Sequence, residues 1–307
     1  MSFPPLEDCW FLAGPTASGK SQRGVELAGR IDAEIVSMDS MALYRRMDIG
    51  TAKPTPEQRA AVPHHLLDVL EPDEECSVAR YGRMAHDAVE QIRARGRRPL
   101  LVGGTPLYLK ALLRGLFEGP PADASFRRRL EDEAARHGPD WLHERLRAVD
   151  PAAAERLHPN DHRRLVRALE VYELTGRPIS RWQGEFDRPG PASNRVYVIH
   201  WPRHELHRRI DERVERMFAE GLIDEVRRLL DAERPIGKTA RQAVGYREVI
   251  DHLRGGPDLP ETIELVRRHT RQLAKRQMTW FRSLPECRMV PMGSWLAGGG
   301  PFEQLGV

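Results

Sequence analysis

Short apolar runs alternate with longer amphipathic segments along the first third of the chain. The runs at residues 10–14, 33–40 and 98–105 are too short to form helices, and the first and the third include glycine at or near their ends. Short apolar runs with such boundaries are typical of buried β-strands. Residues 195–201 form a fourth run of the same kind. The pattern therefore predicts four strands.

Segments with apolar residues at helical spacing lie between these runs. Helices are predicted at residues 21–31 and 78–94, the second ending before Gly96, and at residues 261–283 near the C-terminus. The inner face of the last helix is expected to contain Ile263, Val266, Leu273, Met278 and Phe281. Because strands joined through helices pair in parallel, the alternation predicts an α/β core built on a parallel sheet.

The alternation stops in the middle of the chain. Between residues 119 and 190 the pattern indicates several short helices, separated by turn signals and rich in arginine. These arginines include Arg127, Arg128, Arg129, Arg163, Arg164 and Arg167. We therefore predict one core in two parts, residues 1–118 and 191–307, with a helical insertion at residues 119–190 between them.

Composition narrows the class of protein. The chain has 307 residues, 40% of them hydrophobic and 30% charged, and a formal net charge of +3. These values are typical of a folded globular protein and leave binding to nucleic acid open. No apolar run reaches the ~20 residues that span a bilayer, and the first residues do not form a secretory signal. We expect neither membrane insertion nor secretion, and a cytoplasmic location.

The cysteines indicate no disulfide framework and no zinc site. Cys9, Cys76 and Cys287 are far apart in the sequence, their number is odd, and no two form a CxxC pair. Isolated reduced thiols are expected.

A glycine-rich motif follows the first predicted strand. It matches G-x-x-x-x-G-K-[ST] and consists of Gly14, Pro15, Thr16, Ala17, Ser18, Gly19, Lys20 and Ser21. Glycines let the backbone N–H groups curl towards phosphate oxygens, and the helix that follows adds its positive end. Lys20 would supply a charge to the phosphates and Ser21 a hydroxyl to Mg²⁺. The motif predicts a di- or triphosphate site without saying which ligand occupies it.

Two polar residues end the next two predicted strands. Asp39 and Thr105 would face the same crevice as the loop, because ligands bind at the carboxyl ends of parallel strands. Asp39 could then act as a general base or a metal partner. Two other interpretations stay open: Asp39 and Ser40 could cap a following helix, and Thr105 could be an N-cap.

Several longer motifs resemble the tRNA dimethylallyltransferase family, also called tRNA isopentenyltransferases. Besides residues 14–21, they are DSMALY at 39–44, MDIGTAKP at 47–54, PHHLLD at 63–68, LVGGTPLY at 101–108, HPND at 158–161, RALEV at 167–171, VGYR at 244–247 and QLAKRQMTW at 272–280. They occur in the order typical of the family and extend over most of the chain. The resemblance implies a P-loop NTPase-like parallel sheet core.

The resemblance also implies a reaction. Such an enzyme transfers a dimethylallyl group from dimethylallyl diphosphate to N6 of the adenosine 3′-adjacent to the tRNA anticodon and releases pyrophosphate. Asp39 resembles the general base, Thr105 a residue beside the reacting centre, and Arg209 an arginine near the diphosphate. The loop and Mg²⁺ would hold the diphosphate. Without the resemblance, Arg209 could equally belong to a solvated helix face.

Four segments resemble the tRNA-binding positions of the family. Together with Thr105 they comprise Asp39, Ser40, Met41, Ala42, Arg163, Arg164, Leu165, Val166, Arg167, Gln242, Ala243, Val244, Gly245, Tyr246, Arg247, Lys275, Arg276, Gln277, Trp280 and Arg282. The helical insertion resembles the part that grips the anticodon stem. From the residues alone, the last segment could also be a core helix with a charged outer face.

Two departures from the family pattern and two other classes of function bear on this hypothesis. The family often has glutamine at the position of Ala42 and glycine at that of Arg46, and the zinc finger of eukaryotic relatives is absent, which indicates a bacterial type. A small-metabolite kinase would share the loop but gives no reason for the basic segments. A P-loop scaffold would not need Asp39. We expect tRNA and dimethylallyl diphosphate as ligands, and a monomer with no obligate protein partner.

Overall fold

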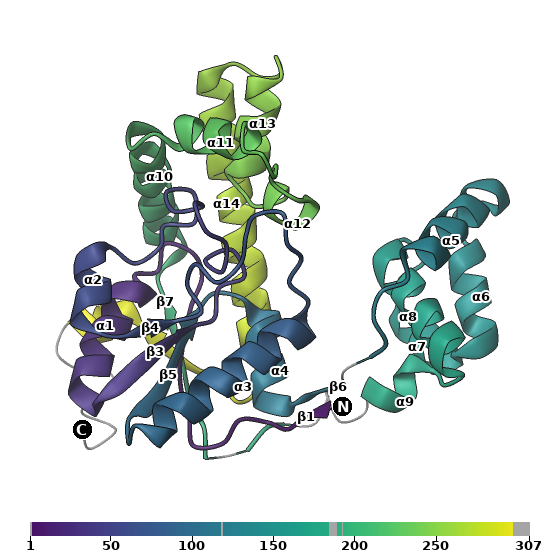
Figure 1. Ribbon diagram of the computed structural model, residues 1–307, viewed down its shortest axis with the longest axis horizontal. Coiled ribbons are helices and arrows are strands. Elements are labelled where there is room, and N and C mark those ends of the chain that lie inside the picture. The colour runs from purple at the N-terminus through teal and green to yellow at the C-terminus, as the bar shows by residue number, and fades with distance from the viewer. Residues whose placement is uncertain (1, 118, 184–188, 192, 297–307) are drawn as a thin grey trace. The chain divides into compact units, whose positions relative to one another are not determined.

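The computed structural model describes residues 2–117, 119–183, 189–191 and 193–296, and the chain divides into two compact units (Figure 1). The larger unit comprises Pro5–Leu113 and Pro189–Val307, and the smaller one Met1–Pro4 and Arg114–Arg188. The larger unit is thus made from two separate stretches of chain.

A six-stranded parallel sheet forms the centre of the larger unit. Its strands lie in the order β4-β3-β5-β2-β7-β8. Their bounds are β2 Trp10–Ala13, β3 Ala33–Ser37, β4 His64–His65, β5 Arg98–Gly103, β7 Arg195–His200 and β8 Arg288–Pro291. All pairings are parallel, so the predicted α/β fold class is confirmed. The sequence pattern missed the short edge strands β4 and β8.

Alternate residues of the strands pack against two separate hydrophobic cores. In β2, Phe11 and Ala13 belong to one core, while Trp10 and Leu12 belong to the other. The first core includes residues of α3 (Val78–Ala94) and α4 (Pro106–Arg114), and the second includes residues of α1 (Lys20–Ile31). Helices therefore cover both faces of the sheet, as parallel sheets require. The short helix α2 spans Pro56–Ala61.

The C-terminal part of this unit is helical. It contains α10 (Arg203–Ala219), α11 (Leu222–Leu230), α12 (Lys238–Arg241), α13 (Tyr246–Leu253), α14 (Leu259–Arg282) and α15 (Met292–Leu296). Of the predicted inner face of α14, Val266, Met278 and Phe281 are buried. Three polar residues, Thr262, Thr270 and Gln277, are buried beside them. A pattern based on apolar residues alone does not find these three.

The smaller unit is an assembly of short helices with its own hydrophobic core. It contains β1 (Ser2–Phe3), antiparallel to β6 (Leu116–Phe117), and α5 (Ala124–His137), α6 (Trp141–Val149), α7 (Pro151–Arg156), α8 (His162–Thr175) and α9 (Ile179–Gln183). Fully buried Glu170 accepts hydrogen bonds from Arg127, Arg167 and the backbone N–H of Asp123. Two guanidinium groups and a backbone N–H thus compensate the buried carboxylate.

Neither a membrane-crossing helix nor a disulfide is found in the described part of the chain. No helix there is both long enough and apolar enough to cross a bilayer. Cys9, Cys76 and Cys287 form no disulfide within the described residues.

Candidate active site

The glycine-rich loop joins β2 to α1 in a tight curve. The backbone is left-handed at Ala17, with φ of 62°, and at Gly19, with φ of 86°. At Gly14 a Cβ atom would lie 2.8 Å from Ser18 Oγ and 3.0 Å from the carbonyl oxygen of Ile199, so a side chain there would crowd the turn. Ser18 is fully buried, and its hydroxyl has no hydrogen-bond partner among the described residues. A buried hydroxyl without a partner in such a loop suits a phosphate oxygen as acceptor.

The carboxyl ends of β3 and β5 meet beside this loop. A Cβ at Gly103 would lie 2.0 Å from the carbonyl oxygen of Met38, so only glycine fits there. The Thr105 hydroxyl accepts a hydrogen bond of 3.0 Å from Ser40 N, and Asp39 Oδ1 accepts one of 3.0 Å from Met41 N. Residues 40–43 form a turn and not a helix, so Asp39 and Ser40 cap no helix there. Thr105 immediately precedes α4, and its carbonyl oxygen accepts the N–H of Leu109, so it occupies the N-cap position while its hydroxyl contacts Ser40. The structure thus brings Asp39 and Thr105 together.

Lys20 adds a cation to this end of the sheet. Its Nζ lies 3.4 Å from the carbonyl oxygen of Pro15 and 3.3 Å from where a Cβ of Gly104 would stand. Burial lowers the pKa of Lys20 to about 8; the Asp39 carboxylate opposes this shift and the charge of Arg213 adds to it. The electrostatic coupling indicates that Lys20, Asp39 and Arg213 form one charged group of side chains.

Gln277 of α14 ties two of these segments together. Its Oε1 accepts a hydrogen bond of 2.9 Å from Thr16 N, and its Nε2 donates one of 2.6 Å to the carbonyl oxygen of Gly104. The side chain is buried, and both of its polar atoms are hydrogen-bonded within the protein. Gln277 therefore positions the loop against the end of β5.

Arg209 of α10 lies against the other side of the loop. Its Nε donates a hydrogen bond of 3.0 Å to the carbonyl oxygen of Ala17, and its guanidinium carbon lies 4.7 Å from the centre of the Trp201 ring. Trp201 Nε1 in turn donates to the carbonyl oxygen of Ser18. The interpretation of Arg209 as part of a solvated helix face is therefore wrong: it contacts the phosphate-binding loop.

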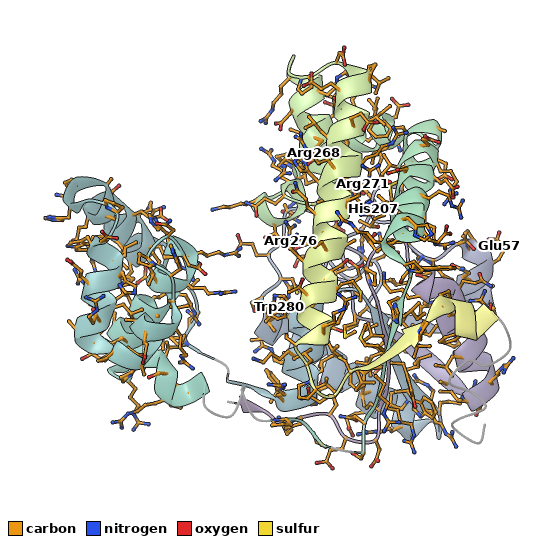
Figure 2. The ribbon with its side chains drawn as sticks, turned by 180° about the vertical axis from the view of Figure 1, so that it is seen from behind. Glu57, His207, Arg268, Arg271, Arg276 and Trp280 are labelled. Atoms are coloured by element: carbon orange, nitrogen blue, oxygen red, sulfur yellow. The ribbon has the colours of Figure 1, made fainter. Side chains whose placement is uncertain are left out.

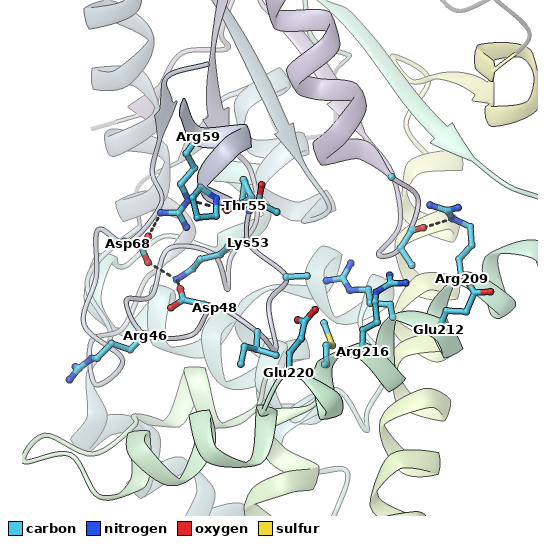
Figure 3. Close-up of a pocket in the computed structure, with 18 of the residues that line it drawn as sticks. Arg46, Asp48, Lys53, Thr55, Arg59, Asp68, Arg209, Glu212, Arg216 and Glu220 are labelled. Atoms are coloured by element: carbon cyan, nitrogen blue, oxygen red, sulfur yellow. Dashed lines mark hydrogen bonds and ion pairs between the residues drawn. The ribbon is translucent and has the colours of Figure 1, made fainter. Parts of the chain in front are cut away.

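A cavity of about 1120 Å³ opens beside the loop (Figure 3). Its wall includes Ala17 and Gly19 of the loop, and Arg209, Arg213 and Arg216 of α10. Residues 45–59 form the opposite wall. Cationic side chains from both walls outnumber the acidic ones, so the cavity suits an anionic ligand.

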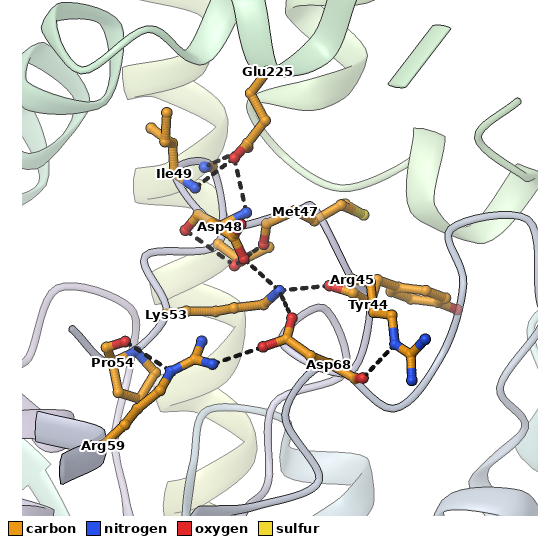
Figure 4. A network of polar contacts seen from close by, with 12 residues as sticks. Tyr44, Arg45, Met47, Asp48, Ile49, Lys53, Pro54, Arg59, Asp68 and Glu225 are labelled. Atoms are coloured by element: carbon orange, nitrogen blue, oxygen red, sulfur yellow. Dashed lines mark hydrogen bonds and ion pairs between the residues drawn. The ribbon is translucent and has the colours of Figure 1, made fainter. Parts of the chain in front are cut away.

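A polar network holds the wall formed by residues 45–59 in place (Figure 4). Glu225 of α11 accepts hydrogen bonds from the backbone N–H groups of Asp48, Ile49 and Gly50, and from the hydroxyl of Tyr246 at 2.6 Å. Buried Lys53 Nζ donates to the Tyr44 carbonyl oxygen, to Asp48 and to Asp68, and Arg59 also pairs with Asp68. Residues 47–54, the MDIGTAKP motif, thus form a loop that is stabilised by hydrogen bonds of its own Lys53 and anchored by the distant carboxylate of Glu225. Sequence reasoning missed Glu225.

Comparison with known proteins places the chain in a family. The family model described as IPP transferase matches residues 42–284. The chain belongs to this family.

Relatives of similar length agree with the family match. A tRNA dimethylallyltransferase of Geobacter metallireducens is 51% identical over 297 residues, which cover 96% of this chain and 94% of that protein. A tRNA dimethylallyltransferase of Rhodopirellula baltica is 48% identical over 310 residues, covering 97% and 92%.

Solved structures of the family resemble the fold. The crystal structure of a tRNA isopentenylpyrophosphate transferase from Bacillus halodurans has a TM-score of 0.69 and 40% identity, covering 94% of this chain and 90% of that one. A eukaryotic dimethylallyltransferase described as acting on tRNA has a TM-score of 0.78 and 29% identity, covering 92% and 73%. The family model, the relatives and the structures therefore agree.

The segments that resemble tRNA-binding positions differ in exposure. On α8, Arg163 and Arg164 are exposed, whereas Leu165 and Val166 are buried in the core of the smaller unit. Arg167 pairs with Glu170 and bonds to the Pro120 carbonyl oxygen. Of this segment, the two outer arginines therefore present their charge at the surface of their own unit, where Arg164 also pairs with Asp161.

The two C-terminal segments show the same division. Gln242 and Arg247 are exposed and Val244 is partly exposed, whereas Ala243, Gly245 and Tyr246 are buried. On α14, Lys275, Arg276 and Arg282 are exposed and Trp280 is partly so; Figure 2 shows Arg276 and Trp280 along the same helix.

Near the loop, Ala42 is also buried, and Ser40 and Met41 are partly exposed. The side chains of Ala42, Leu165, Val166, Ala243 and Tyr246 thus belong to hydrophobic cores.

Proposed function

We propose that this chain is a tRNA dimethylallyltransferase. It transfers the dimethylallyl group of dimethylallyl diphosphate to N6 of the adenosine 3′-adjacent to the anticodon, and pyrophosphate leaves. The observation that carries the proposal is the meeting of the phosphate-binding loop with Asp39 and Thr105 at one end of the sheet, in a chain of the IPP transferase family. The relatives that carry the name tRNA dimethylallyltransferase support it.

The loop is proposed to hold the diphosphate of the donor. The buried Ser18 hydroxyl, the Lys20 ammonium group and the N-terminus of α1 all favour phosphate oxygens there. These groups would stabilise the negative charge that develops on the departing pyrophosphate. The Arg209 guanidinium, anchored to the Ala17 carbonyl oxygen, would add a further cation beside the loop.

The side chains present fit Mg²⁺ bound jointly with the donor. No cluster of three His, Cys, Asp or Glu side chains that could hold a metal alone is found in the described residues. Mg²⁺ is usually held by one or two protein oxygens together with substrate phosphates and water, and the Ser21 hydroxyl at the start of α1 is an oxygen of that kind. When bound there, Mg²⁺ would neutralise charge on the diphosphate.

Asp39 is the proposed general base. An exocyclic amine is a weak nucleophile, and a carboxylate that accepts its proton as the C–N bond forms accelerates the attack. Asp39 is held in place through its bond to Met41 N, while Thr105 fixes the neighbouring Ser40. Both side chains are partly exposed, so a substrate base can reach them.

The exposed basic residues are proposed to bind the tRNA. Arg163 and Arg164 in the helical unit would contact the anticodon stem, and Lys275, Arg276, Trp280 and Arg282 of α14 would contact phosphates and unstacked bases. A target base within a folded loop must be flipped out before a reaction can occur at its amine. The enzyme would act in the cytoplasm, where its tRNA substrate is found.

The test is a reaction with defined substrates. The purified chain is incubated with tRNA, dimethylallyl diphosphate and Mg²⁺, and the nucleosides are analysed by mass spectrometry for an N6-dimethylallyl adenosine. Asp39→Asn is the matched variant, since its amide oxygen still accepts the Met41 N–H. We expect transfer to fall roughly 10²- to 10⁴-fold in this variant with pyrophosphate binding retained. Absence of the modified nucleoside with the unmutated chain, or ATP-dependent phosphorylation of a small metabolite, would refute the proposal.

A further inference from the structure

A cluster of three ionisable side chains joins α13 to α14. Arg247 and Glu248 lie in the first turn of α13, and His269 lies in the middle of α14. Glu248 Oε1 accepts hydrogen bonds from Arg247 Nη2 at 2.6 Å and from His269 Nδ1 at 2.7 Å. Its Oε2 accepts the backbone N–H of Gly245 at 2.7 Å. One carboxylate, directly after the VGYR segment at residues 244–247, thus links the two helices.

The buried Glu248 carboxylate does not depend on Arg247 alone. Only 3% of the Glu248 side chain is exposed. Burial raises its pKa, but hydrogen bonds from Gly245 N, Arg247 and His269 outweigh that effect and hold the pKa below its usual value. The Gly245 N–H and His269 Nδ1 already give each carboxylate oxygen one donor. Arg247 is therefore a second donor to Oε1, and the need to satisfy Glu248 does not by itself explain it.

The start of a helix is an unfavourable place for the cation of Arg247. Arg247 is the second residue of α13, where the positive end of the helix dipole opposes a guanidinium. About half of its side chain, 48%, is exposed. Within the described residues the side chain is bonded through Nη2 only, so Nε and Nη1 have no acceptor in that part of the chain. The guanidinium is thus fixed at one nitrogen and open at the other two.

His269 limits where this guanidinium can lie. Its Nδ1 is 2.7 Å from Glu248 Oε1 and 3.1 Å from Arg247 Nη2. An ionised carboxylate only accepts hydrogen bonds, so Nδ1 carries a proton and donates it to Glu248. The imidazole therefore packs beside the guanidinium and keeps the shared Glu248 oxygen in place. Consecutive residues of a helix do not face each other, so the bond between Arg247 and Glu248 is not supplied by helix geometry.

The cluster lies on a basic side of α14. His269 and Arg276 are seven residues apart, which is close to two helical turns, so they lie on the same side of the helix. Arg276 is exposed, and Figure 2 shows it on α14. By contact with His269, Arg247 of the neighbouring helix adds a cation to the side that contains Arg276.

We propose that His269 is a positioning residue for tRNA binding: through the Glu248 carboxylate it holds the Arg247 guanidinium beside the basic side of α14, where Arg247 contacts an RNA phosphate. This inference rests on the proposed function, because it takes the substrate to be tRNA. A guanidinium that is already oriented loses less side-chain freedom when it binds. The two nitrogens that have no acceptor, Nε and Nη1 of Arg247, remain for the phosphate oxygens.

The direct test measures tRNA affinity by filter binding with the full chain. Arg247→Gln should weaken binding roughly 5- to 20-fold and lower the slope of log K against log salt by about one unit. His269→Ala should weaken it about three- to five-fold. His269→Asn should restore it to within about two-fold, because Asn Nδ2 can donate to Glu248 from the place of Nδ1. The double variant should bind no more weakly than Arg247→Gln, since His269 acts through Arg247.

Two controls distinguish positioning from a general structural role. His252→Ala removes another histidine of α13, one that bonds to the Pro257 carbonyl oxygen, and its tRNA affinity should stay within about two-fold. Affinity for inorganic pyrophosphate with Mg²⁺ should also stay within about two-fold in His269→Ala. Four results would each overturn the inference: unchanged tRNA affinity in His269→Ala, unchanged tRNA affinity in Arg247→Gln, additive losses in the double variant, or an equal loss of pyrophosphate affinity.

Steady-state kinetics separates the inference from the function on which it rests. In His269→Ala the KM for tRNA should rise by a factor similar to the loss of affinity, while the KM for dimethylallyl diphosphate stays within about two-fold. A rise confined to the KM for dimethylallyl diphosphate would contradict the assigned role. If the unmutated chain bound tRNA but transferred no prenyl group, the proposed reaction would be refuted, and the binding series would still decide the role of His269.

Discussion

The backbone N–H of Thr16 in the phosphate-binding loop donates a 2.9 Å hydrogen bond to the Gln277 side chain, which comes 261 residues later in the chain. The Nε2 of the Gln277 side chain donates a second hydrogen bond, to the carbonyl oxygen of Gly104. The loop is therefore held against the sheet by α14, the helix whose outer surface carries Arg276 and Trp280. One helix supports the donor site from its inner side and presents basic and aromatic groups on its outer side.

Replacing Gln277 should weaken both the fold and the loop. Gln277→Met keeps the volume but leaves Thr16 N and the Gly104 carbonyl oxygen without their partner. We expect the free energy of unfolding in urea to fall by roughly 1–3 kcal/mol and the Kd for pyrophosphate to rise. Arg268→Gln, an exposed change on the same helix, should alter neither value. Gln277→Met with undiminished pyrophosphate affinity would show that the loop keeps its shape unaided.

The lowered pKa of Lys20 predicts a dependence of donor binding on pH. Burial brings this pKa from 10.5 to about 8, so the ammonium group loses its proton as the pH rises through that value. A diphosphate favours the charged amine, so binding should take up a proton near pH 8 and weaken between pH 7 and 9. Titration calorimetry in buffers of different ionisation enthalpy measures that uptake.

Lys20→Arg provides the matched control, because a guanidinium stays charged throughout this range. Changes in the ionisation of the ligand itself are common to both proteins and cancel in the comparison. A variant and an unmutated protein with the same pH profile would contradict the assignment of the titration to Lys20.

The Glu225 carboxylate should be a major source of stability for the loop formed by residues 48–50. Glu225→Gln replaces one of the two acceptor oxygens by a donor, which in either orientation faces at least one backbone N–H of residues 48–50, and we expect a loss of about 2 kcal/mol. Tyr246→Phe removes only one donor and should cost about 1 kcal/mol. Urea unfolding of both variants and of the double variant measures the coupling between the two residues. The two losses of unfolding free energy should be clearly non-additive, because both variants disrupt the same hydrogen bond. Additive losses would mean that Glu225 and Tyr246 act separately.

Affinity for tRNA should fall steeply with salt concentration, since phosphate contacts release counterions. Arg163→Gln and Arg164→Gln should each lower the slope of log K against log salt by about one unit if the residue contacts a phosphate. Arg145→Gln, an exposed change in the same unit but on α6 rather than α8, should leave the slope close to its original value. Filter binding between low and high salt gives the slopes. Equal slopes in all four proteins would exclude α8 as a phosphate-contacting surface.

Local sequence signals predicted much of the core. The helix at residues 78–94 has the predicted bounds, and α1 begins one residue before its prediction. The rule that parallel strand ends face a common crevice anticipated that Asp39 and Thr105 lie at the same end of the sheet, where Thr105 bonds to Ser40, the neighbour of Asp39. These features depend on short-range periodicity and on topology, which a single sequence contains.

Other features depend on distant partners and could not be predicted. Gln277 is expected from the sequence to contact tRNA, but it is buried and supports the loop instead. Its role and those of Glu225 and Arg213 depend on contacts with segments over 160 residues away in the chain. Buried residues such as Leu165 differ from their prediction for another reason: the family resemblance covers a contiguous segment of α8, whereas a helix exposes only one side. Their apolar character was the signal that would have excluded them.

The point at which the smaller unit is inserted has a consequence for how the gene can be rearranged. A Cβ at Gly190 would lie 2.1 Å from the Leu113 carbonyl oxygen, so the chain leaves the larger unit and re-enters it at almost the same spot. A few flexible residues would suffice to join positions 113 and 190. The insert is thus replaceable in principle, and a shortened chain without it should still fold around the six-stranded sheet.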